Sequence, residues 1–177
     1  MLAAVHRSEN GEPDQYIGIF TDLTLLKQAE VKAEHAATHD PLTMLPNRRR
    51  LDQVLPEQLR ACRDHGRALT LAVFNVDRFQ SVNDSFGLPS GNALLVEISA
   101  RLRSVLPAEK LFHLGADEFV VLLEGVPVGH ALLVDRTLAH LCSKIQLDQH
   151  AMLPSVSVGV ASFPDLAADG NALLQNA

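Results

Sequence analysis

Two short runs of alternating apolar and polar residues stand at the start of the chain, at residues 2–8 and 15–21. Asn10, Gly11, Glu12 and Pro13 lie between them, and these residue types favour tight turns. The pattern therefore predicts a β-hairpin. Because two strands alone have marginal stability in water, we do not expect this hairpin to be stable by itself.

The next segment, residues 24–38, is rich in Ala, Leu, Glu and Lys and carries a thin apolar stripe at helical spacing. It predicts an exposed connecting helix. Such a weak stripe does not stabilise an isolated helix, so we expect it to pair with a second copy of the chain or with the hairpin. The stripe consists of Leu25, Ala29, Ala33 and Ala36.

The remaining residues alternate between helical and strand patterns. An unbroken apolar run at residues 69–74 is typical of a central strand that is covered on both faces. The order of elements predicts an α/β domain with a mixed sheet, helices packed on it, and a site at the strand ends. Helices are expected at residues 47–65, 94–105, 131–145 and from 171 onward, a hairpin at 110–124 and a strand at 155–163.

Composition narrows the class of protein. The 177 residues are 47% hydrophobic, enough for one substantial core. The net charge of −6 argues against a nucleic-acid-binding surface, which needs clustered Lys and Arg. No run approaches the length of a membrane span, and two distant cysteines fit a reducing compartment. We therefore expect a soluble, cytoplasmic segment with no membrane or nucleic-acid partner.

Acidic residues mark the chemistry. Asp117 and Glu118 occupy the turn of the expected hairpin, and Asn75 and Asp77 follow the apolar strand. If these two strands are neighbours, the polar groups share one edge of the sheet. Oxygen ligands at such an edge are typical of Mg²⁺-nucleotide chemistry.

Five sequence segments recur in a characteristic order: DPLTMLPNRR at 40–49, NVDRFQSVNDSFG at 75–87, GNALL at 91–95, LGADEF at 114–119 and SVSVGVASFP at 155–164. Together they resemble, over residues 38–177, the GGDEF domain of diguanylate cyclases. The resemblance implies a fold like the palm of nucleotidyl cyclases and polymerases, with a ferredoxin-like core. It also implies an activity, in which two GTP-loaded domains face each other and condense two GTP into cyclic di-GMP.

The N-terminal residues resemble the tail of a PAS domain, with TDLT at 21–24 similar to its usual exit into a signalling helix. We therefore expect a PAS tail at 1–23, a signalling helix at 24–39 and a GGDEF domain at 40–177. The chain ends before the family's C-terminal Tyr-x-Ala-Lys segment, so the GGDEF domain is expected to be C-terminally truncated.

Metal binding in the family uses an Asp at the strand end, the next backbone carbonyl and an acid of the hairpin. The matching positions here are Asn75, Val76 and Asp117. Asn75 is neutral, and hard cations favour full carboxylate charge, so Mg²⁺ binding is expected to be weak or absent. Asp117 and Glu118 are the candidate catalytic acids. The alternative is that they are solvated turn residues.

Guanine recognition in the family uses an Asn and an Asp, matched here by Asn83 and Asn92. A carboxylate accepts both N–H groups of guanine, whereas the amide of Asn92 presents one acceptor and one donor. Selectivity for guanine is therefore expected to fall. Without the resemblance, Asn83 would more often be a turn residue, because Asp84, Ser85 and Gly87 follow it.

The backbone of Gly115 and Ala116 is expected to approach the substrate, and Ala116 replaces the family's second Gly. If this position needs a positive φ, the methyl group costs ~1 kcal/mol. Gln80 replaces a Lys of the triphosphate region.

We therefore expect a degenerate GGDEF domain that is catalytically inactive, dimeric, and regulatory for a following cyclic di-GMP phosphodiesterase domain of the EAL type. Two alternatives remain. One is an active diguanylate cyclase that condenses two GTP, and the other is a GTP-binding allosteric module.

Overall fold

The computed structural model describes residues 2–7, 13–19, 22–125, 127–147, 150–165 and 169–177. The chain falls into two units, Met1–His35 and Ala36–Ala177. In the first, β1 (Leu2–Arg7) pairs antiparallel with β2 (Pro13–Ile19), which confirms the hairpin. The turn predicted at Asn10, Gly11 and Glu12 lies outside the described residues.

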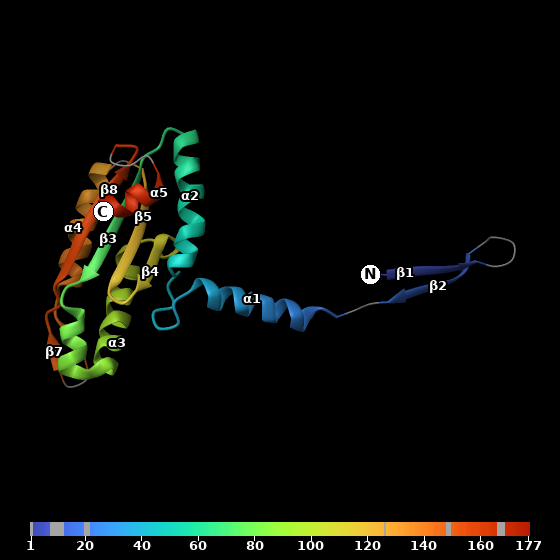
Figure 1. Cartoon of the computed structure of the whole chain (residues 1–177), viewed down its shortest axis with the longest axis horizontal. Helices are drawn as coiled ribbons and strands as arrows, with labels where there is room; N and C mark the ends of the chain where they lie inside the picture. Colours follow the sequence, from blue (N-terminus) through green and yellow to red (C-terminus); the bar gives the residue numbers. More distant parts are fainter. Residues whose placement is uncertain (1, 8–12, 20–21, 126, 148–149, 166–168) are drawn as a thin grey trace. The chain divides into compact units, whose positions relative to one another are not determined.

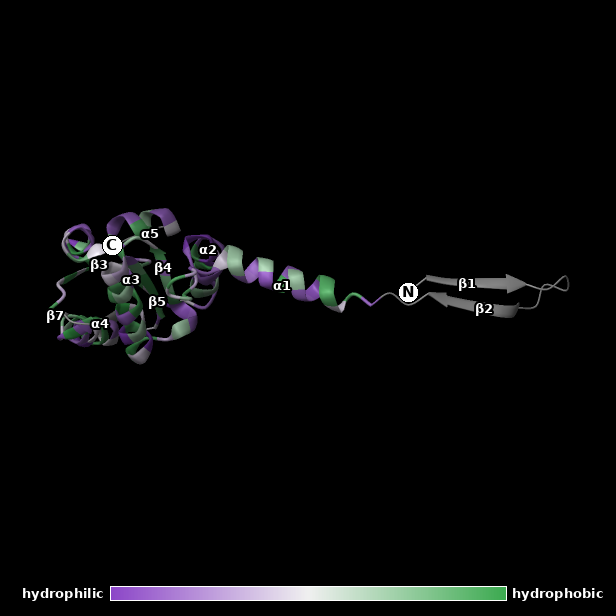
Figure 2. Cartoon of the chain, turned by 90° about the horizontal axis from the view of Figure 1, so that it is seen from below, coloured by the Kyte–Doolittle hydropathy of each residue, from purple (hydrophilic) through white to green (hydrophobic). Residues whose placement is uncertain are grey.

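The predicted connecting helix is α1 (Thr24–Thr38). It begins where the backbone N–H of Thr24 donates to Asp22 Oδ1 at 2.8 Å, which satisfies one of the free donors at a helix start. Hydrophilic and hydrophobic residues alternate along α1 in Figure 2, and Leu25 is 81% exposed. The helix thus carries apolar side chains that are not buried within this chain.

The second unit is built on a four-stranded sheet with the order β4-β5-β3-β8. All of its ladders are antiparallel, so the expectation of a mixed sheet was wrong in this detail. The reason is that helix α3 (Phe79–Val105) connects β3 to β4, but β5 lies between these two strands in the sheet, so they are not neighbours. The strands are β3 (Leu69–Val76), β4 (Leu111–Gly115), β5 (Glu118–Glu124) and β8 (Val156–Phe163).

Helices cover both faces of this sheet (Figure 1). One face packs against α3 (Phe79–Val105) and α4 (Pro127–Leu141), and the other against α2 (Arg48–Asp64) and α5 (Gly170–Asn176). Successive residues of β3 point to opposite faces: Ala72 and Phe74 belong to the first core, and Leu69 and Leu71 to the second. This double burial explains the unbroken apolar run, and the β-α-β-β-α-β order confirms the ferredoxin-like, palm-like α/β fold.

A small second sheet was not predicted. It pairs β6 (Ile145–Leu147) with β7 (His150–Met152), where the sequence pattern indicated the end of a helix at 131–145. The helix ends at Leu141, where the guanidinium of Arg101, from α3, donates to the carbonyls of its last two residues and of two residues that follow. Its acceptors are the backbone oxygens of His140, Leu141, Ser143 and Lys144. A 3-10 turn, Ala108–Lys110, precedes β4.

None of the helices that the structure describes combines the length and the apolar character needed to cross a bilayer.

Candidate functional site

The ends of β3 and β5 bring together the residues that the sequence indicated for metal binding. Asn75 of β3 is the direct partner of Glu118 in the antiparallel register. The backbone N–H of Val76 donates to the carbonyl of Asp117 at 3.0 Å. The two candidate acids therefore lie at the end of the central strand, next to Asn75.

The turn between β4 and β5 adopts a backbone that favours glycine. Gly115 has φ 117° and Ala116 has φ 49°, and the β4–β5 register shifts between His113 and Gly115. Ala116 thus occupies the left-handed region, which costs an L-residue roughly 1–2 kcal/mol. The sequence analysis expected the methyl group of Ala116 to be costly if this position has a positive φ, and the structure shows a positive φ there.

Few negative charges at this edge are available to a cation. Glu118 lies 3.8 Å from the guanidinium of Arg48, with both side chains exposed. Asp77 accepts hydrogen bonds from the hydroxyls of Ser155 at 2.5 Å and Ser157 at 2.7 Å. These bonds, first that of Ser155 and then that of Ser157, lower the pKa of Asp77 below its usual value. The carboxylate of Asp77 is therefore already held by two donors, Ser157 of β8 and Ser155, which directly precedes β8.

The residues at this edge of the sheet supply two carboxylates, Asp117 and Glu118, and one neutral amide, Asn75. Among the residues that the structure describes, no three His, Cys, Asp or Glu side chains gather where they could hold a metal ion. The neutral Asn75 takes the place at the strand end where a third carboxylate would complete such a group with Asp117 and Glu118. Mg²⁺ prefers carboxylate oxygens, and an amide oxygen supplies no charge.

Asn83 and Asn92 lie on either side of a break in α3, where Gly87 has φ 81°. Asn83 belongs to the helical segment before the break, so the interpretation of Asn83 as a turn residue was wrong. Its Oδ1 is buried and lacks a hydrogen-bond partner among the described residues. The amide lies directly against Gly91, because a Cβ placed there would stand 1.8 Å from Asn83 Oδ1. Asn92 follows Gly91 and is exposed.

A cavity of about 700 Å³ opens at the end of β3, lined by Asn75 and Val76 but not by Asn83 or Asn92. It reaches from Asn75 and Val76 to Val82 and Leu94 of α3, and Val82 directly precedes Asn83 in the chain. Residues 152–155 close its other side, and nothing in the sequence pattern predicted this wall, because β6 and β7 have only three residues each. Asp77 and Arg78 complete the lining.

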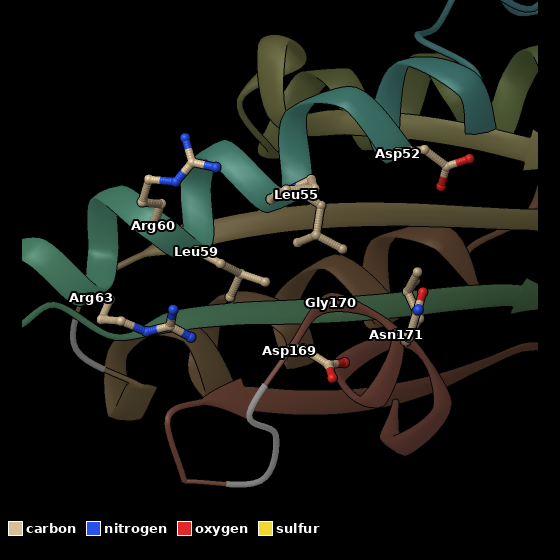
Figure 3. Close-up of a pocket in the computed structure, with 10 residues that line it drawn as sticks. Asp52, Leu55, Leu59, Arg60, Arg63, Asp169, Gly170 and Asn171 are labelled. Carbon is tan, nitrogen blue, oxygen red and sulfur yellow. The ribbon is translucent and has the colours of Figure 1, made fainter.

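A second pocket, of about 510 Å³, lies away from these residues between α2 and α5 (Figure 3). Leu55 and Leu59 of α2 contribute apolar surface, and Arg63 and Asp169 lie on opposite sides. None of the site residues predicted from the sequence lines it, so we assign the candidate site to the cavity at the end of β3.

The sequence model of the family described as diguanylate cyclase, GGDEF domain, matches residues 37–177. The chain is 35% identical over 156 residues to the diguanylate cyclase TpbB of Pseudomonas aeruginosa, covering 86% of this chain and 36% of that protein. It is 32% identical over 156 residues to the bifunctional diguanylate cyclase/cyclic di-GMP phosphodiesterase MucR of the same species. This match covers 87% of this chain and 23% of MucR. The matched region therefore spans about a third of the length of TpbB and about a quarter of the length of MucR.

Among solved structures, a sensory box/GGDEF family protein from Caulobacter crescentus CB15 is 33% identical. It superposes with a TM-score of 0.74 over 79% of this chain and 92% of that one. The motif residues at the end of β3, in the β4–β5 turn and on α3 lie within the matched region. We conclude that this chain belongs to the GGDEF family of diguanylate cyclase domains.

Proposed function

We propose that this GGDEF domain of a cyclic di-GMP signalling protein makes no cyclic di-GMP itself and instead regulates an adjoining phosphodiesterase domain of the EAL type. The observation that carries the proposal is the amide of Asn75 directly opposite Glu118 at the end of the central strand. In the family this position holds a charged metal ligand, and here it holds a neutral one.

The neighbouring charges do not compensate for this loss. Arg48 lies beside Glu118, and Asp77 is held by two serine hydroxyls. Magnesium supplies charge neutralisation on the phosphates when it is bound in such sites. With Asp117 and Glu118 as the remaining acids, this chain is proposed to bind Mg²⁺ weakly or not at all.

A second candidate, a GTP-binding allosteric module, is favoured by the buried Oδ1 of Asn83. An unsatisfied buried acceptor costs free energy, and rotation of the Asn83 amide away from Gly91, toward the cavity that the preceding Val82 lines, would let Oδ1 accept a ligand N–H. Asn92, with one donor and one acceptor, would then bind a purine with less preference for guanine than a carboxylate gives. This module would hold a nucleotide without turning it over.

The test is a calorimetric titration of the 177-residue chain with GTP and Mg²⁺, followed by chromatography of the products. We expect no cyclic di-GMP. If GTP binds, the result favours the GTP-binding allosteric module. If GTP does not bind, the result favours a regulatory domain that holds no nucleotide. Formation of cyclic di-GMP by the unmodified chain would overturn both. In the double variant Asn75→Asp/Asn92→Asp, we expect at least tenfold tighter GTP binding; an unchanged affinity would make Ala116 the main obstacle.

The context of the domain is also proposed. The hairpin of residues 1–23 is taken as the tail of a PAS domain, and α1 as a signalling helix that pairs two chains. The exposed Leu25, Leu26 and Val31 support pairing through α1. Sedimentation analysis of the chain should give a dimer, and Leu25→Lys together with Leu26→Lys should give a monomer. The relative MucR, which is named as bifunctional, supports a phosphodiesterase partner.

A further inference from the structure

Arg101 of α3 is a largely buried charged residue that lies outside every family motif, and the proposed function does not use it. Its side chain is 12% exposed. Nε donates to Glu97 Oε1, one helical turn earlier, at 2.9 Å. Nη1 and Nη2 donate to the last turn of α4 and to the residues that follow it. Their acceptors are the carbonyl oxygens of His140 (3.1 Å), Leu141 (3.4 Å), Ser143 (2.8 Å) and Lys144 (2.8 Å) and the hydroxyl of Ser143 (2.7 Å).

This contact fixes the start of the segment between α4 and β6. The last carbonyls of a helix have no partner within the helix and carry the negative end of its dipole, so a cation is favourable there. The flat, forked guanidinium reaches several carbonyls at once, which the single ammonium group of a lysine cannot do. Without Arg101, the carbonyls of Ser143 and Lys144 would lose a charge-assisted hydrogen bond each.

The residues that Arg101 fixes lead directly to the wall of the cavity at the end of β3. Ile145 follows Lys144, is 1% exposed, and pairs with Met152 in the antiparallel register of β6 and β7. Met152 is the first of the residues 152–155 that line the cavity. One peptide unit and one strand pair therefore join the anchor at Arg101 to the cavity.

The other end of the wall is held separately, by Asp77. Its carboxylate accepts a hydrogen bond from the hydroxyl of Ser155, and its backbone N–H donates to the carbonyl of Ser155 at 2.9 Å. Between the two ends Leu153 is 73% exposed, so packing of its side chain does little to hold the wall. The wall also lies outside the four-stranded sheet, so its place depends on these attachments.

We propose that Arg101 is a positioning residue of the cavity: it fixes the residues after α4, and the Ile145–Met152 pair carries that position to the wall. Leu94, on another side of the cavity, lies with Arg101 on the part of α3 that follows the break at Gly87. The same helical segment thus sets two sides of the cavity. This role does not require a bound nucleotide, so it can be tested separately from the proposed function.

The test is NMR of the 177-residue chain with ¹³C in its methionine methyl groups. The chain has three methionines, and Met152 lines the cavity, so its signal reports on the wall. Met152→Leu identifies that signal by removing it. Arg101→Lys keeps the charge but not the forked donors. We expect it to shift or broaden the Met152 signal and to leave that of Met44, on the loop before α2, unchanged.

Amide hydrogen exchange shows whether the change is local. Loss of a charge-assisted hydrogen bond should speed exchange at residues 145–147 and 150–152 about tenfold in Arg101→Lys, while β3 and β5 keep their rates. An equal acceleration in β3 and β5 would mean that Arg101 acts only on overall stability, and would overturn the proposal. An unchanged Met152 signal would overturn it as well.

Three further variants complete the test. Arg136→Lys, at an exposed position of α4, is the matched control, and a Met152 shift as large as that of Arg101→Lys would contradict the proposal. Ser143→Ala removes one acceptor and keeps the arginine, so we expect a smaller Met152 shift. If Arg101→Lys does not fold, this variant decides, and an unmoved Met152 signal in it would refute the proposal. Asp77→Ala should speed exchange at Ser155 but not in β6; faster exchange in β6 would show that Arg101 does not fix that end independently.

Discussion

Asn75 and Glu118 face each other across the antiparallel strands β3 and β5, as direct partners in the register. Asn75 is exposed, so the amide is not required by a buried hydrogen bond at this position. An amide beside a carboxylate avoids the repulsion that two carboxylates would suffer in the absence of a cation. The sequence at this edge is therefore compatible with a stable strand end that holds no metal.

Asn75→Asp should make the stability of the domain depend on magnesium. A carboxylate opposite Glu118 is expected to destabilise the domain by about 0.2–1 kcal/mol in EDTA, because like charges on paired residues repel. Added Mg²⁺ should reverse this loss, whereas the wild type should respond little. Urea unfolding with and without Mg²⁺ measures the effect. The control, Asn171→Asp on α5, adds the same charge elsewhere, and an equal magnesium response there would contradict the prediction.

Ala116→Gly should stabilise the domain by about 0.5–1 kcal/mol, because glycine adopts a φ of 49° without strain. This figure is a net gain, since glycine also gives the unfolded chain more conformational freedom, which partly offsets the relief of strain. The unfolding midpoint in urea checks this. Ala100→Gly is the matched control: Ala100 is exposed in α3, where glycine should cost about 1 kcal/mol. Destabilisation by both substitutions would show that the turn is not strained at Ala116.

Gly91→Ala should displace the amide of Asn83, because the added Cβ would stand 1.8 Å from Oδ1. We expect a loss of about 1 kcal/mol from this overpacking. In an Asn83→Ala background the same substitution should stabilise α3 by about 1 kcal/mol, since alanine is the better helix former. Thermal unfolding of the four proteins of this cycle gives the coupling. Gly129→Ala in α4, where a Cβ meets no atom within 4 Å, serves as the control, and additive effects at Gly91 and Asn83 would contradict the predicted contact.

Acid should weaken the domain partly through Asp77. Hydrogen bonds from Ser155 and Ser157 lower the pKa of Asp77 in the folded state, so the stabilising contribution is fully present above the unfolded pKa. It is lost as the pH falls below about 4 and through the folded value. The double variant Ser155→Ala/Ser157→Ala should therefore show a shallower fall in urea stability between pH 5 and pH 3 than the wild type. Equal slopes would mean that the serines do not stabilise the carboxylate.

Local pattern predicted most of the elements, because the spacing of apolar residues follows from the period of a helix or a strand. The hairpin of the first unit, α2, β3 and the β4–β5 hairpin were recognised in this way. Boundaries were less certain where a distant side chain decides them. α4 ends at Leu141 rather than near residue 145, and there Arg101 of α3 donates to its last carbonyls, a contact that no local pattern indicates.

The sequence by itself determined the family motif and its departures, since Asn75, Asn92 and Ala116 can be read directly against the pattern. Only the tertiary structure decided that Asn75 opposes Glu118, that Asn83 has an unsatisfied buried oxygen beside Gly91, and that His113 bridges Asp40 and Ala116. These relationships join residues far apart in the chain. Strand pairing and side-chain burial set them, and neither leaves a periodic signal in the local sequence.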